Sequence, residues 1–122
     1  ADKLVVNWQL PKEDVMYDMV ITALTLQSVI EKMLVNVIRM TTETIYIDIK
    51  VTWLQHRVDI TISVQLPKKA LLINHDLRQH MDFMIQAQRL RAYFGQSADI
   101  QSSIMNKQIL TNISYPLQDV SL

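Results

Sequence analysis

The stretch TIYIDIKVTWLQHRVDITISVQLP, residues 44–67, alternates apolar and polar side chains in two runs. Alternation with a period of two is typical of β-strands that bury one face. The residues LQHR separate the runs and include no glycine, so the register must come from the strands themselves. We therefore predict a hairpin with one apolar face, which holds Ile45, Ile47, Ile49, Val51 and Trp53 in one strand and Val58, Ile60, Ile62, Val64 and Leu66 in the other.

The opposite face of this hairpin is polar. We expect it to be solvated, and an interaction surface is the alternative. A sheet that stacks RNA bases needs exposed aromatic and basic side chains, and this face offers only Tyr46 and Lys50, so RNA binding is disfavoured. The predicted polar face contains Tyr46, Asp48, Lys50, Thr52, Asp59, Thr61, Ser63 and Gln65, with Asn7, Gln9, Asn112 and Ser114 beside them.

Further strands and helices are predicted on both sides of the hairpin. Residues 4–10 alternate as a short strand, and Pro11 with the acids after it begins a helix over residues 11–40. A second helix is expected within residues 72–96, with Asn74 as its N-cap and Gly95 just beyond its end. Ser97 is expected to cap a short third helix that ends near residue 107, and residues 109–115 alternate as a last strand.

This order of elements predicts an α+β fold with two layers. The simplest arrangement is a ferredoxin-like βαββαβ sandwich, in which two long helices cover one face of a mainly antiparallel four-stranded sheet. A chain of 122 residues is long enough to bury one core without disulfides or metals. We therefore expect a single α+β domain over residues 1–122.

Composition excludes several classes of function. Twelve Lys and Arg balance twelve Asp and Glu, so no net field attracts nucleic acid or an anionic membrane. The absence of cysteine excludes disulfides, thiolate catalysis and Cys-based zinc sites. No apolar run approaches the roughly 20 residues of a membrane-spanning helix, and the first residues do not resemble a signal peptide. We expect a soluble protein, either cytoplasmic or a mature exported one.

Loops are scarce, because the chain has one glycine and three prolines. This leaves little room for a flexible catalytic loop or a glycine-rich phosphate loop. We expect no cofactor.

The helix predicted over residues 11–40 is apolar over more than half of its circumference. A surface helix has an apolar stripe a little over about 100° wide, so this one needs at least two neighbours. The adaptable methionines on this helix form a candidate interface, with core filling as the alternative. The leading hypothesis is a non-enzymatic scaffold or assembly module that forms a homodimer or binds a protein partner. The methionines of this candidate interface are Met16, Met19, Met33 and Met40.

Five polar side chains interrupt the apolar sectors of the two long helices. Gln27 and Glu31 lie in the first, and His80, Gln88 and Arg91 lie in the second. A buried carboxylate needs a partner, so we predict that Glu31 contacts Arg91 or His80, unless all five side chains reach water from the rims. The alternative function is a small enzyme or ligand-binding domain with its polar site between the helices.

Overall fold

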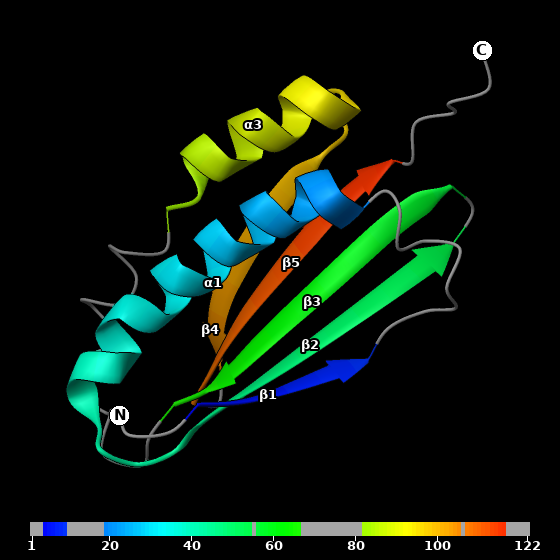
Figure 1. Ribbon diagram of the computed structural model, residues 1–122. Coiled ribbons are helices and arrows are strands. Elements are labelled where there is room, and N and C mark those ends of the chain that lie inside the picture. The colour runs from blue at the N-terminus through cyan, green and yellow to red at the C-terminus, as the bar shows by residue number, and fades with distance from the viewer. Residues whose placement is uncertain (1–3, 10–18, 55, 67–81, 106, 117–122) are drawn as a thin grey trace.

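Two helices lie side by side on one face of a five-stranded sheet (Figure 1). The computed structural model describes residues 4–9, 19–54, 56–66, 82–105 and 107–116. The sheet is mixed and has the strand order β1-β2-β3-β5-β4. The predicted α+β two-layer architecture is confirmed. The elements are β1 (Leu4–Gln9), α1 (Met19–Met40), β2 (Ile45–Leu54), β3 (Arg57–Gln65), α3 (Met84–Phe94), β4 (Asp99–Met105) and β5 (Gln108–Pro116).

The β2–β3 hairpin forms in the predicted register. Ile49 pairs with Ile62, and Val51 pairs with Ile60. These four side chains are at most 3% exposed, because they face the helices. Trp53 departs from the prediction, since it lies at the turn end of β2 and is 44% exposed.

Two hairpins turn without glycine, because each has a residue with a side chain in the left-handed region of backbone φ/ψ angles. His56 has φ 66° between β2 and β3, and Lys107 has φ 63° between β4 and β5. Such a conformation costs a residue with a side chain about 1–2 kcal/mol. The paired strands on either side of each turn offset this cost.

The ferredoxin-like arrangement is wrong, because β1 and β2 are direct neighbours. They run parallel, with Leu4 opposite Ile45 and Trp8 opposite Ile49. In a split βαβ unit another strand lies between the two strands that the first helix joins. Here α1 carries the chain back along the sheet, and the chain enters β2 immediately beside β1.

A fifth strand occupies the segment that was predicted as a short third helix. β4 pairs with β5, with Ile100 opposite Ile113 and Ile104 opposite Ile109. Ser102 lies between the two isoleucines on the same face. The helix prediction followed from the polar residues after Ser97, and it overlooked this alternation.

Within the described residues the second long helix is α3, and it ends where predicted. Asn74, the predicted N-cap, lies outside the described residues, and α3 begins at Met84. Asp82 accepts a hydrogen bond at Oδ1 from the backbone N–H of Met84 at 3.0 Å. Gly95 ends the helix with φ 95°, and its N–H bonds to the carbonyl of Arg91 at 2.9 Å. Of the helix predicted over residues 11–40, the structure describes residues 19–40, all within α1.

The core lies between the sheet and the helices. Phe94 stacks on Tyr115 with ring centroids 4.2 Å apart, which ties the end of α3 to β5. Five apolar side chains of α1 enter this core and are at most 5% exposed. These residues are Leu26, Val29, Met33, Leu34 and Val37.

Candidate functional site

The two helices meet through polar side chains. Lys32 on α1 donates from Nζ to the carbonyl of Asp82, just before α3. The same ammonium lies 5.7 Å from the centroid of the Phe83 ring. About one turn away on each helix, Gln86 donates from Nε2 to Oγ of Ser28 at 3.0 Å. A half-buried cation and a buried amide therefore lie at the α1–α3 junction.

Gln86 carries an unsatisfied acceptor. The residue is 9% exposed, and its Oε1 has no hydrogen-bond partner in the described structure. Leaving a buried polar group unpaired costs about 1–3 kcal/mol. This oxygen is open to a donor between the helices.

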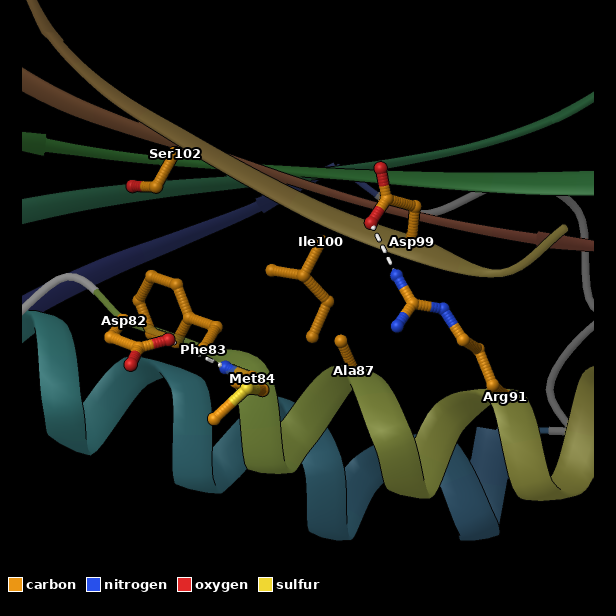
Figure 2. A pocket seen from close by; sticks show the side chains of 8 residues that line it. All are labelled: Asp82, Phe83, Met84, Ala87, Arg91, Asp99, Ile100 and Ser102. Carbon is orange, nitrogen blue, oxygen red and sulfur yellow. Dashed lines mark hydrogen bonds and ion pairs between the residues drawn. The ribbon is translucent and has the colours of Figure 1, made fainter. Parts of the chain in front are cut away.

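A cavity of about 300 Å³ lies between α3 and β4 (Figure 2). Ala87 and Arg91 face it from α3, one helical turn apart, because side chains at i and i+4 share a helix face. Ile100 and Ser102 face it from β4, because alternate residues of a strand share a face. The lining residues are Asp82, Phe83, Met84, Ala87, Arg91, Asp99, Ile100 and Ser102.

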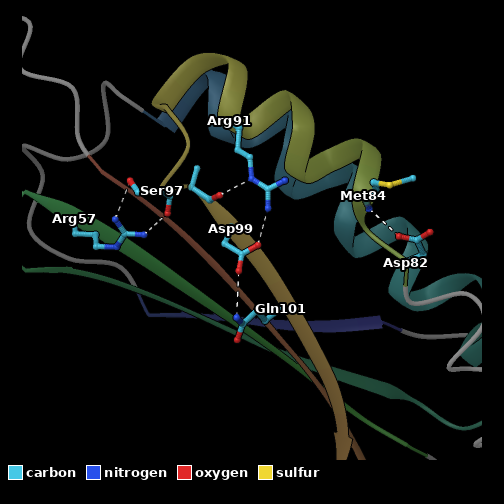
Figure 3. A network of polar contacts seen from close by, with 8 residues as sticks. Arg57, Asp82, Met84, Arg91, Ser97, Asp99 and Gln101 are labelled. Atoms are coloured by element: carbon cyan, nitrogen blue, oxygen red, sulfur yellow. Dashed lines mark hydrogen bonds and ion pairs between the residues drawn. The ribbon is translucent and has the colours of Figure 1, made fainter.

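Arg91 closes one end of this cavity with a network of hydrogen bonds (Figure 3). Its Nε donates to the carbonyl of Ala98 at 3.0 Å, and its Nη2 donates to Oδ1 of Asp99 at 3.0 Å. Gln101 donates from Nε2 to the other oxygen of Asp99 at 3.2 Å. The network ties the last turn of α3 to the start of β4.

A second arginine joins the same region to the centre of the sheet. Arg57 on β3 donates from Nε to Oγ of Ser114 on β5 at 2.9 Å. Its Nη2 donates to the carbonyl of Ser97 at 2.7 Å (Figure 3). Arg57 thus fixes the loop that leads into β4, and with it one wall of the cavity.

The structure does not bring the five predicted polar residues together. Gln27 donates from Nε2 to Oε1 of Glu31 at 3.1 Å, and both side chains are exposed on α1. Arg91 is bonded to the start of β4, so the predicted contact with Glu31 does not form. The reason is the rotation of α1, which presents Ser28 and Lys32 to α3 instead of Glu31. Gln88 is exposed, and His80 lies outside the described residues.

Of the four predicted interface methionines, one is placed. Met33 is 1% exposed and fills the core, as the alternative held. Met19 and Met40 belong to α1, but their side chains are not among those described, and Met16 lies outside the described residues.

Sequence reasoning missed Lys32, Gln86 and the β4 side of the cavity. Neither Lys32 nor Gln86 was among the residues predicted to form a site. Asp99 and Ser102 were hidden because their segment was assigned to a helix. The alternation of Ile100, Ser102 and Ile104 is the signal that would have placed them on a strand.

Metal sites and membrane spans are absent from the described ranges. Residues 4–9, 19–54, 56–66, 82–105 and 107–116 contain no group of three or more His, Asp or Glu side chains that could hold a metal ion. In the same part of the chain, neither helix is long and apolar enough to cross a membrane.

Comparison with known proteins gives matches at the level of structure. No protein-family model matches the chain, and no curated protein matches its sequence. The catalytic domain of histidine kinase ThkA, in a nucleotide-free form, has a TM-score of 0.56 and 12% identity, over 93% of this chain and 78% of that one. The histidine kinase domain of the Erythrobacter litoralis EL346 blue-light activated histidine kinase has a TM-score of 0.55 and 16% identity, over 96% of this chain and 56% of that one.

Two more solved structures extend the comparison. The Acinetobacter baumannii histidine kinase AdeS has a TM-score of 0.55 and 14% identity, over 97% of this chain and 56% of that one. ThkA in complex with the response regulator protein TrrA has a TM-score of 0.52 and 12% identity, over 94% of this chain and 34% of that one. The chain thus resembles the ATP-binding (Bergerat) fold of histidine kinases.

This likeness contradicts the hypothesis of a non-enzymatic scaffold or assembly module. It agrees better with the alternative, a small enzyme or ligand-binding domain. The physical basis of the scaffold hypothesis was the wide apolar arc of α1. Among the side chains of α1 that the structure describes, five apolar ones are buried in the core, whereas Val35 and Ile38 are 40% and 44% exposed.

Proposed function

We propose that residues 1–122 form one nucleotide-binding domain of the histidine kinase catalytic type, with ATP as its ligand. The observation that carries the proposal is the fold, which matches the nucleotide-free catalytic domain of ThkA over 93% of the chain. A shared fold alone supports many functions, so the local chemistry of the α1–α3 junction must also suit such a ligand.

The α1–α3 junction offers a cation for a phosphate group. Lys32 is half-buried, and its ammonium already bonds to a backbone carbonyl at the start of α3. A phosphate oxygen is a stronger acceptor than this carbonyl, because its negative charge adds a Coulomb attraction to the ammonium. The N-terminal end of α3 adds the positive pole of a helix dipole beside Lys32.

The way this chain binds phosphates must differ from that of a glycine-rich loop. Such loops use glycines so that backbone N–H groups can surround the phosphates. The whole chain holds one glycine, Gly95, and it ends α3. Phosphate binding therefore relies on side-chain charge, and we assign the main contribution to Lys32.

The test is equilibrium binding of a fluorescent ATP analogue to the wild-type protein and to Lys32→Ala. We expect the variant to bind about five- to tenfold more weakly, the effect of losing a contact of roughly 1–1.4 kcal/mol. Lys50→Ala is the matched control, because Lys50 is exposed on the opposite face of the sheet and its loss should leave the affinity unchanged.

Thermal unfolding of Lys32→Ala separates a lost contact from a lost fold. The Lys32 bond is partly solvated, so its removal should lower the stability by less than about 1 kcal/mol. The proposal fails if the folded wild-type protein does not bind the nucleotide at about millimolar concentration. It also fails if Lys32→Ala and wild type bind equally well, because the assigned phosphate contact would then be wrong.

A protein partner is the second part of the proposal. The ThkA structure with response regulator TrrA supports a partner of the response regulator class for this chain. Co-elution of the purified chain with such a protein in size-exclusion chromatography tests this part separately from nucleotide binding.

A further inference from the structure

The α3–β4 cavity has a hydrogen-bond donor at one end. Arginine carries five N–H groups, and the two bonds of Arg91 to Ala98 and Asp99 use one N–H of Nε and one of Nη2. Three N–H groups remain. Figure 2 shows the other terminal nitrogen of Arg91 directed toward the space between Ala87 and Ile100. A ligand can therefore accept hydrogen bonds from Arg91 without breaking its contact with Asp99.

The opposite end of the cavity has an acceptor. Asp82 uses Oδ1 to bond the backbone N–H of Met84 at 3.0 Å. Its Oδ2 has no hydrogen-bond partner among the described residues, and the side chain is exposed at the start of α3. Lys32 bonds to the carbonyl of Asp82 and not to its carboxylate. One carboxylate oxygen is thus available to a cationic group.

Three apolar residues lie between these two ends, the buried Phe83 and Ala87 and the half-buried Ile100, although most of the surface that the cavity exposes is polar. The short side chain of Ala87 leaves space above α3 (Figure 2). Among the described residues around the cavity, the two carboxylates of Asp82 and Asp99 balance the cations of Arg91 and Lys32. A neutral site with separated charges suits a neutral ligand with separated charges.

We propose that this cavity binds a linear zwitterion, with an ammonium group at Asp82, a carboxylate at Arg91 and a short chain between them. Met84 and Arg91 are seven positions apart, which is about 10 Å along a helix. The Arg91 side chain leans back toward the start of α3 and shortens this span. A cavity of about 300 Å³ is at the small end of ligand sites, which suits a molecule the size of an amino acid.

This site is distinct from the proposed nucleotide site. The nucleotide contact uses the Lys32 ammonium on the α1 side of Phe83, whereas the zwitterion uses two side-chain groups on the β4 side of α3. The two proposals can therefore fail separately.

Three probes of equal chain length test the proposal in an NMR titration of the whole chain without nucleotide. They are 6-aminohexanoate, hexanoate and hexylamine. The wild-type protein should bind 6-aminohexanoate about fivefold or more tightly than either probe with one charge, since each partly exposed ion pair contributes up to about 1 kcal/mol. The shifted amides should belong to α3 and β4.

Charge-removing variants identify each end of the ligand. Asp82→Asn keeps an oxygen for the N–H of Met84 and removes the charge, so 6-aminohexanoate should then bind no better than hexanoate. Arg91→Gln should make 6-aminohexanoate bind no better than hexylamine. Arg89→Gln is the matched control, because Arg89 is an exposed residue of the same helix outside the cavity lining.

Several outcomes would overturn the proposal. The first is equal binding of all three probes by wild type, and the second is a set of shifts outside α3 and β4. The third is an Asp82→Asn variant that still prefers 6-aminohexanoate as strongly as wild type does. Asp82 forms no salt bridge with a described residue, so this variant should fold.

Discussion

Arg91 and Asp99 form an ion pair, with Nη2 of the arginine 3.0 Å from Oδ1 of the aspartate. The two residues lie on either side of the turn that begins at Gly95, so the pair closes the connection between α3 and β4. Their side chains are 35% and 43% exposed. Exposed pairs contribute little, because water and salt screen them.

Asp99→Asn should therefore lower the free energy of unfolding by about 0.5–1 kcal/mol. Urea denaturation at low salt measures the change, and the difference from wild type should shrink in about 1 M salt. Asp59→Asn, on the polar face of β3, is the control. A loss above about 2 kcal/mol that salt does not reduce would mean that the pair acts as a buried one.

Removing side-chain volume from the hairpin core should be far more costly. Ile62 is completely buried, so Ile62→Ala should destabilise the protein by roughly 2–5 kcal/mol. Its neighbour Thr61 points to the other face and accepts only a long hydrogen bond, 3.4 Å from Nδ2 of Asn112. Thr61→Ala should cost less than about 1 kcal/mol. Equal effects of the two changes in chemical denaturation would contradict the register.

The Ser28–Gln86 contact offers a test of buried hydrogen bonding. Ser28→Ala leaves both ends of the Gln86 amide without a partner and should cost about 1–3 kcal/mol. The double variant Ser28→Ala, Gln86→Leu removes the amide as well and should recover much of that loss. Thermal melts of the single and double variants decide the question. If the double variant is the less stable of the two, the Gln86 amide has a second partner besides Ser28.

The turn residues allow substitutions with opposite expected signs. His56→Gly relieves a left-handed conformation and should stabilise the protein by up to about 1 kcal/mol. Gly95→Ala places a side chain at φ 95° and should destabilise it by about 1–2 kcal/mol, although no atom lies within 4 Å of the added methyl group. Unfolding curves of both variants should shift in opposite directions. A stabilising Gly95→Ala would show that the end of α3 relaxes to another conformation.

Parts of the fold with strict alternation could be predicted from the sequence. The β2–β3 hairpin has isoleucine or valine at nearly every second position, and β5 alternates Ile109, Thr111, Ile113 and Tyr115 on its buried face. Burial of one face fixes the register of these strands. The end of α3 was also predictable, because Gly95 is the only residue of the chain that adopts φ 95° without strain. The polar face opposite the core was predicted correctly for the same reason, and Asn7 indeed bonds to Asp48 across it at 3.2 Å.

The rest depended on tertiary contacts that the sequence pattern does not carry. β4 has only two isoleucines, and its polar residues resemble those of a capped helix until β5 is beside it. The rotation of α1 decides that Lys32 and not Glu31 meets α3, and a difference of one position along a helix is about 100° of rotation. The neighbour of β1 is likewise set by the packing of α1 and not by the alternation of the strand itself.

The pairing of β3 with β5 at the centre of the sheet has a consequence for the speed of folding. These strands are adjacent in space, although α3 and β4 lie between them in the chain. The β2–β3 and β4–β5 hairpins are local and can form independently, but joining them closes a long loop, which is entropically slow. We therefore expect the pairing of β3 with β5 to form late in folding. Contacts that form late affect mainly the unfolding rate, so a ligand that holds α3 against the sheet should chiefly slow unfolding.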